Sequence, residues 1–189
     1  MVTPLEYHEL QASPADLDAA FIRWKETHGP ADSIRRSHMW QRDPFMHPIM
    51  AATDSHTLEV FSAQASCDYP DHDHTSNELL GRERFLAICT ICDWRRIADI
   101  ENDVIEAWHD HSLPGWRELP VIPLSVTSVG EIKKLPAKIA EWAEVHYPAS
   151  WQIPGSPIIT ERSGSFTRHI PGHSPWGGYK LSDSALASN

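Results

Sequence analysis

The chain lacks a long apolar run and contains few cysteines. No stretch of about 18 apolar residues occurs, so we expect no transmembrane helix. Residues 1–10 carry neither a basic flank nor an apolar segment, so we expect no signal peptide. The three cysteines, Cys67, Cys89 and Cys92, argue against a disulfide framework, because their number is odd and a secretion signal is missing. We therefore expect a cytoplasmic protein with no membrane partner.

Positive charge is also scarce. The formal net charge is −10 at pH 7 with histidine counted as neutral. An acidic surface disfavours non-specific binding along phosphate backbones, although it permits a local basic patch, a basic protein partner or mimicry of nucleic acid. The sequence has no Gly-x-Ser-x-Gly elbow, Walker loop or dinucleotide fingerprint, so none of these catalytic or nucleotide-binding classes is indicated.

The apolar content is sufficient for one core. The chain has 189 residues, 41% of them hydrophobic, and eight tryptophans, each of which can bury a large area. Fifteen prolines predict many turns and extended segments. We predict a single α+β domain over residues 1–150, an irregular Pro/Gly/aromatic arm packed on it over 151–181, and a disordered tail over 182–189.

Local signals predict the helices and strands. Ser13 is a good N-cap and Pro14 suits the first helical position, while Gly29-Pro30 ends a helical pattern. Apolar periodicity supports further elements along the chain. These predictions are a helix over 14–28, a strand over 57–65, a hairpin over 84–94, a helix over 99–109, a short strand over 121–126 interrupted by Pro123, and a helix over 135–146 stopped by Pro148.

Two thiols in the predicted hairpin turn indicate a metal site. Cys89 and Cys92 are two residues apart, so both sulfurs can point at one ion. The next predicted helix ends in His109-Asp110-His111, which supplies imidazoles. Zinc prefers this combination of sulfur and nitrogen ligands. We predict a Zn²⁺ site in a zinc finger-like knuckle over 84–116.

The sequence does not determine which residues complete the metal shell beside Cys89 and Cys92. On a helix, His109 and His111 lie roughly 200° apart, so both can bind one ion only if the helix breaks between them. Cys67 can be the fourth ligand, or it can form a second site with His72 or His74. Paired imidazoles in an Asp-rich loop also occur in hydrolytic metal sites, and the alternative is a solvated polar loop.

The spacing differs from that of a DNA-reading finger. Such fingers place about 12 residues between the second cysteine and the first histidine, and their histidines lie three to five apart. Here more residues separate Cys92 from His109, a single residue separates His109 from His111, and the predicted helix is acidic. We therefore expect the metal to hold the fold, because metal binding adds to folding free energy.

Two small basic clusters are candidate ligand-binding sites. Arginine binds phosphate or carboxylate in a bidentate manner, and both clusters lie beside aromatic residues. The alternative is that these arginines pair with the many carboxylates of the chain. The candidates are Arg35 and Arg36 in one cluster, and Arg162, Arg168 and His169 in the other.

Three segments together carry a resemblance. They are Cys89-Thr90-Ile91-Cys92-Asp93-Trp94, His109-Asp110-His111 with Pro114-Gly115-Trp116, and Thr167-Arg168-His169-Ile170-Pro171-Gly172-His173-Ser174-Pro175-Trp176-Gly177-Gly178-Tyr179. The chain resembles, over about residues 20–181, an uncharacterised family of proteins from actinobacteria, their phages and their plasmids. The resemblance implies a cytoplasmic, often mobile-element protein with an accessory interaction role and no catalytic residue to carry over. Trp108 stands where a smaller residue is expected.

From these observations we expect a zinc-stabilised, non-enzymatic binding protein, with a protein partner or with nucleic acid bound through the arginine clusters. One alternative is a zinc-dependent hydrolase or nuclease that uses His72 and His74. Another is an acidic nucleic-acid mimic that inhibits a host protein.

Overall fold

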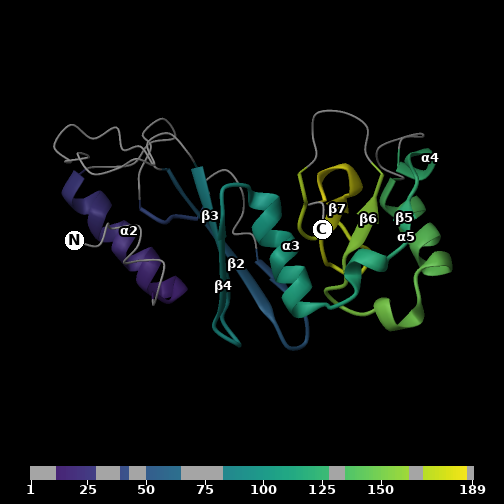
Figure 1. Ribbon diagram of the computed structural model, residues 1–189, viewed down its shortest axis with the longest axis horizontal. Helices are drawn as coiled ribbons and strands as arrows, with labels where there is room; N and C mark the ends of the chain where they lie inside the picture. The colour runs from purple at the N-terminus through teal and green to yellow at the C-terminus, as the bar shows by residue number, and fades with distance from the viewer. Residues whose placement is uncertain are drawn as a thin grey trace. The chain divides into compact units, whose positions relative to one another are not determined.

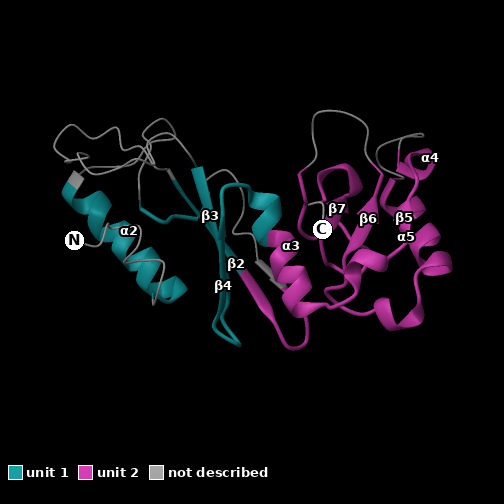
Figure 2. Ribbon diagram, viewed as in Figure 1, with its two compact units in different colours: residues 1–49, 59–104 teal, residues 50–58, 105–189 magenta. Residues whose placement is uncertain are grey.

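The structure is a computed structural model that describes residues 12–28, 39–42, 50–64, 83–127, 135–161 and 168–186. The chain divides into two compact units, residues 1–49 with 59–104, and residues 50–58 with 105–189 (Figure 2). The predicted α+β class is confirmed, since helices accompany small sheets. Among the described helices, none combines the length and the apolar character that a bilayer crossing requires.

Helix α2 (Pro14–His28) has the bounds that its sequence signals predict. Its N-terminus is a reciprocal cap, in which the Asp16 backbone N–H donates to Ser13 Oγ (3.2 Å) and the Ser13 backbone N–H donates to Asp16 Oδ2 (3.0 Å). The side-chain hydrogen bond from Ser13 is the largest cause of a lowered Asp16 pKa. Two backbone donors that a helix start leaves unpaired are thereby satisfied.

A four-stranded sheet has the order β1-β2-β3-β4, with β2 and β4 antiparallel to β3 (Figure 1). Its strands are β1 (Met50–Ala52), β2 (Thr57–Gln64), β3 (Glu83–Cys89) and β4 (Trp94–Ala98). The β2 strand and the β3–β4 hairpin agree with the sequence prediction to within a few residues. In the register, Phe61 faces Leu86.

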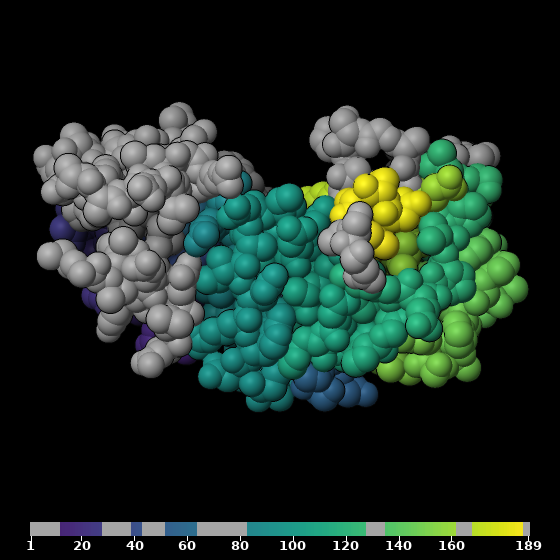
Figure 3. Space-filling model, in the orientation of Figure 1, coloured from purple at the N-terminus to yellow at the C-terminus, as the bar shows by residue number. Residues whose placement is uncertain are grey.

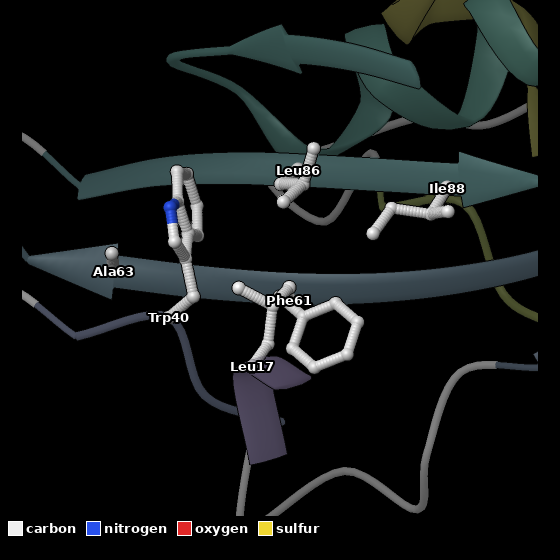
Figure 4. Packing of buried hydrophobic residues seen from close by; sticks show 6 residues of the cluster. All are labelled: Leu17, Trp40, Phe61, Ala63, Leu86 and Ile88. Carbon is white, nitrogen blue, oxygen red and sulfur yellow. The ribbon is translucent and has the colours of Figure 1, made fainter. Parts of the chain in front are cut away.

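Apolar side chains at every second position of β2 and β3 build the core of the first unit. Phe61 and Ala63 on β2 and Leu86 and Ile88 on β3 cluster with Leu17 of α2 and with Trp40, and all six are nearly inaccessible (Figure 4). Side chains two residues apart share one face of a strand, so these strand positions form one apolar surface. Burying a side chain such as Leu17 stabilises the fold by about 2 kcal/mol, which fixes α2 on the sheet.

The chain passes from the β3–β4 hairpin into helix α3 (Glu101–Ser112). The sequence predicts this helix over 99–109, and the structure continues it to Ser112, before Gly115 adopts a left-handed φ of 91°. A short 3-10 helix, η1 (Trp116–Glu118), follows. Since the helix does not break at Asp110, the two flanking histidines point to different sides of α3.

A second sheet, in the second unit, is parallel and has the order β5-β6-β7. Its strands are β5 (Val121–Ile122), β6 (Ile158–Thr160) and β7 (Lys180–Ser182). The helices in the same part of the chain are α4 (Leu124–Thr127), α5 (Leu135–His146), η3 (Ala149–Trp151) and η4 (Asp183–Ala185). The predicted strand over 121–126 is shorter, because the chain turns into α4 after Pro123. The segment expected to be an irregular arm contributes β6 and β7.

Residues 182–186, predicted to be disordered, have a defined structure. Ser182 ends β7 and is 1% exposed, and its backbone N–H donates to His169 Nδ1 (3.1 Å). The 3-10 helix η4 follows directly. In the space-filling view, the yellow atoms of this C-terminal segment reach the surface shown (Figure 3). Pairing with β6 and the buried histidine acceptor fix the position of Ser182, from which η4 continues.

Candidate metal centre

Both cysteines of the Cys-x-x-Cys segment lie at the β3–β4 turn. Cys89 is the last residue of β3 and is buried, whereas Cys92 is exposed in the turn. Asp93 follows with a left-handed φ of 54°, and Trp94 pairs with Cys89 across the hairpin. Desolvation raises the pKa of the Cys92 thiol, and a hydrogen bond with Cys89 adds to the shift. A metal ion bound by this thiol would have to displace its proton, and such binding would weaken as the pH falls.

Two histidines form a second pair. His56 closes a tight turn before β2, in which its backbone N–H donates to Thr53 Oγ1 (3.1 Å) and its carbonyl accepts from the Thr53 N–H (2.9 Å). His111 lies in the last turn of α3, and the two rings meet edge to face with centroids 4.8 Å apart. Both side chains are half-buried.

Trp108 explains how this histidine pair is positioned. Its indole N–H donates to the Thr57 carbonyl (2.9 Å), next to His56, and its side chain is fully buried. His111 is three residues further along α3, so it lies on the same face of the helix as Trp108. The large side chain at position 108 thus anchors the histidine-bearing face of α3 to the start of β2.

His56, Cys89, Cys92 and His111 together form a group that can hold a metal ion, with one ligand atom from each lying within 4.8 Å of the others. Ligand atoms around tetrahedral zinc are about 3.3 to 3.8 Å apart at ordinary bond lengths. The upper limit of 4.8 Å on the separation of these atoms thus exceeds the spacing around a bound zinc by about an ångström. Two sulfurs and two imidazoles satisfy all four positions of a tetrahedral ion, which is the pattern of a structural site.

His109, the other histidine predicted at the end of α3, lies outside this group. It is fully buried, and its Nδ1 lies 2.8 Å from the Ile105 carbonyl. Its ring meets Trp108, Trp116 and Tyr179, the first and last edge to face. Burial lowers the pKa of His109 to about 4. The structure therefore brings three predicted ligands together, namely Cys89, Cys92 and His111, and places His109 in an aromatic core.

His169, predicted to bind a ligand, is buried in a polar network. Its Nε2 lies 2.9 Å from Glu106 Oε1, and its Nδ1 accepts from the Ser182 backbone. An accepting Nδ1 leaves Nε2 as the protonated nitrogen that donates to the carboxylate. His169 therefore joins the C-terminal segment to α3. Arg168 beside it is half-buried.

Arg117 completes this network. Its guanidinium donates to Glu106 Oε2 (3.0 Å) and, through two nitrogens, to both oxygens of Asp110 (2.9 Å each). Partial burial raises the pKa of Asp110, but hydrogen bonds from Arg117 and Trp116 outweigh it, and the net pKa lies below its usual value. The buried Glu106 carboxylate is thus paired on both oxygens, as a buried charge requires.

The other predicted site residues fall outside the described part of the chain. They are Arg35, Arg36, Cys67, His72, His74 and Arg162.

Sequence reasoning did not single out His56. It is one histidine in a polar turn, with no metal-ligand spacing to Cys89 or His111. Its relation to them depends on strand pairing, because antiparallel β2 begins at the end of the sheet where β3 finishes. The signal that was available is the position of a histidine directly before a predicted strand adjacent to the Cys-x-x-Cys hairpin.

Comparison with known proteins identifies a family for this chain. No curated protein and no solved structure matches this chain. The match is to a family model that covers residues 3–189, which is nearly the whole sequence. The chain therefore belongs to DUF6349, a family of unknown function.

Proposed function

We propose that this protein binds one Zn²⁺ through His56, Cys89, Cys92 and His111, and that the ion stabilises the fold. The observation that carries the proposal is the convergence of these four donors within 4.8 Å. The borderline-soft donor set suits zinc better than magnesium or calcium, which prefer oxygen ligands. Structural zinc sites contribute directly to folding free energy.

The same coordination supports a non-enzymatic role. Four protein ligands leave no open position for a reacting water, whereas a catalytic zinc has three protein ligands and one water. We infer a cytoplasmic binding module that acts on a protein partner, as an accessory protein of a mobile element. The strongly acidic composition supports a partner with a basic surface.

Metal stoichiometry tests the zinc proposal. The protein purified without chelator should contain one zinc per chain by elemental analysis, and Cys92→Ser, His111→Ala and His56→Ala should each lose most of it. His146→Ala is a matched control, because His146 is an exposed histidine on α5 that stacks on Trp142. Equal zinc content in all five proteins would refute the assigned ligands.

Cobalt substitution tests whether the four protein ligands fill the coordination shell of the metal. Co²⁺ in a tetrahedral site with two thiolates should give sulfur-to-metal charge-transfer bands and strong d–d bands that do not respond to added azide or cyanide. A response to these anions would indicate an exchangeable position and therefore a catalytic site. It would overturn the structural role while leaving metal binding intact.

A further inference from the structure

The β3–β4 turn places two thiols of unequal accessibility beside each other. Cys89, the last residue of β3, is 0% exposed, whereas Cys92 is exposed in the turn. The turn residues 90–93 are all exposed, so a small molecule in solution can reach the Cys92 sulfur. Access to the Cys89 sulfur is blocked, because the last four residues of β3 are buried.

The two sulfur atoms are close enough to join. They belong to the group of ligand atoms that lie within 4.8 Å of one another. A disulfide bond is about 2 Å long, so the two atoms must approach by less than about 3 Å. Cys92 lies between Cys89 and Trp94, which form the last pair of the hairpin ladder, so its side chain can move without breaking that ladder.

This arrangement is typical of a pair of cysteines that responds to oxidants. The thiolate is the nucleophile, and a bound metal keeps its cysteine ligands deprotonated. Cysteines that react with oxidants are accessible and often lie next to a second cysteine that converts the first product to a disulfide. Cys92 meets the first condition, and its neighbour Cys89 meets the second.

We propose that a hydroperoxide oxidises Cys92 and Cys89 to a disulfide, and that this reaction releases the zinc. The inference rests on the proposed function, since the released ion is the zinc assigned there. A disulfide is not a thiolate ligand, so the ion would keep only His56 and His111 and would leave the site. Oxidation thereby removes the stabilisation that the ion supplies.

The reaction has two steps. The Cys92 thiolate attacks one oxygen of the hydroperoxide, so that a sulfur–oxygen bond forms, the oxygen–oxygen bond breaks, and the leaving oxygen takes a proton from water and departs as an alcohol. The Cys89 thiolate then attacks the sulfur of the resulting sulfenic acid, so that the sulfur–sulfur bond forms and hydroxide leaves, protonated, as water. The two cysteines lose two electrons, and the hydroperoxide gains them.

Hydrogen peroxide, for which the alcohol is a second water, is the probe, and it is added to the zinc-loaded full chain. A chromogenic chelator measures released zinc, and mass spectrometry follows the thiols after alkylation and digestion. Trypsin releases residues 85–95 as one peptide, which holds Cys89 and Cys92 but not Cys67. We expect loss of one zinc per chain together with a disulfide inside this peptide. A phosphine reductant followed by added zinc should restore both the thiols and the metal.

Two further measurements test which cysteine reacts first and whether the third takes part. Brief treatment of the wild type in the presence of dimedone should label the sulfenic acid on Cys92, and a label on Cys89 instead would contradict the assigned order. Cys67→Ser is the matched control and should release zinc as the wild type does.

The inference fails if peroxide leaves zinc and thiols in place, or if zinc leaves without a disulfide in the 85–95 peptide. Zinc that stays bound refutes only this inference, whereas a purified protein that contains no zinc refutes the proposed function. The wild-type peptide map decides the matter even if the variant does not fold.

Discussion

At the scale of single residues, two glycines show how closely the backbone approaches itself in the second unit. A Cβ on Gly178 would lie 2.2 Å from the Ser156 carbonyl oxygen and 2.4 Å from that of Gly155. A Cβ on Gly155 would lie 2.3 Å from the Ala52 carbonyl oxygen. These neighbours are backbone atoms, which cannot rotate away as a side chain does, so the sites tolerate no side chain without movement of the chain.

Replacing Gly178 should therefore be far more damaging than replacing Gly172. Gly178→Ala should lower the free energy of unfolding by more than about 3 kcal/mol, because the methyl group overlaps backbone oxygens. Gly172→Ala should cost only about 1 kcal/mol, the strain of a left-handed residue with open space around it. Urea unfolding measures both. Equal losses would show that the close backbone approach at Gly178 is not present in solution.

The buried His109 should make stability depend on pH. Its pKa is about 4 in the folded protein, mainly because of burial, against about 6.5 in an unfolded chain. The unfolded state therefore takes up the proton first as pH falls, and the stabilisation is present above about pH 6.5 and lost progressively down to about pH 4.

The measurement is the free energy of unfolding of wild type and His109→Gln at about pH 7.5 and pH 4.5. The wild type should lose about 2 to 3 kcal/mol more than the variant over this interval. Protonation of the metal ligands affects both proteins equally, so the difference isolates His109. A parallel decline in the two proteins would contradict the assignment.

At the scale of elements, α3 is a helix on which several polar contacts of the second unit converge. Trp108 bonds to the start of β2, His111 supplies a proposed metal ligand, and Glu106 bonds to Arg117 and His169. These contacts leave the helix on different sides, so its rotation is fixed by several independent bonds. A single helix thus sets the positions of the metal ligand and of the C-terminal segment.

Arg117→Met should weaken this element strongly. Glu106 is 1% exposed, and loss of the guanidinium leaves its Oε2 without that cation, which should cost about 3 kcal/mol. Arg84→Met is the control, because Arg84 and Asp99 form a partly exposed pair at 3.4 Å that should contribute less than about 1 kcal/mol. Chemical unfolding compares the two, and similar costs would contradict a buried role for Glu106.

The elements also show what the sequence can and cannot predict. Helix α2 is predictable to the residue, because Ser13, Pro14 and Gly29 are local signals that act on their own neighbours. Strands β6 and β7 escape prediction because three residues are too few to establish a two-residue period. They form through parallel pairing with distant segments.

The candidate metal centre likewise contains some ligands that the sequence predicts and others that it does not. Cys89 and Cys92 are recognisable because they are close in sequence and lie in a predicted turn. The choice of His111 over His109 depends on whether α3 breaks, and on a helix that continues to Ser112 the two point to different sides. The place of His56 depends on the pairing of β2 with β3, so its position directly before a predicted strand is only a weak signal.

At the scale of the whole molecule, the proposed zinc should be a measurable part of stability. An ion that binds the folded state and not the unfolded chain adds about 2.7 kcal/mol when free metal exceeds its dissociation constant a hundredfold. Chelator-treated protein should therefore melt at a lower temperature than zinc-loaded protein, and re-addition of zinc should restore the transition.

Differential scanning calorimetry makes this comparison, with Cys92→Ser as the control. That variant should melt at the same temperature with and without chelator, because it has lost the site. An unchanged melting temperature in the wild type would show that the ion does not stabilise the fold, even if it binds.

The parallel sheet has a consequence for how the second unit folds. Its three strands come from residues 121–122, 158–160 and 180–182, and β6 lies between the other two. Pairing segments so far apart requires closure of long loops, which is slow compared with forming the β3–β4 hairpin. During synthesis, β6 can gain its β7 neighbour only after residues 180–182 leave the ribosome. A chain truncated before Tyr179 would therefore expose an edge of β6 and should be captured by chaperones or proteases.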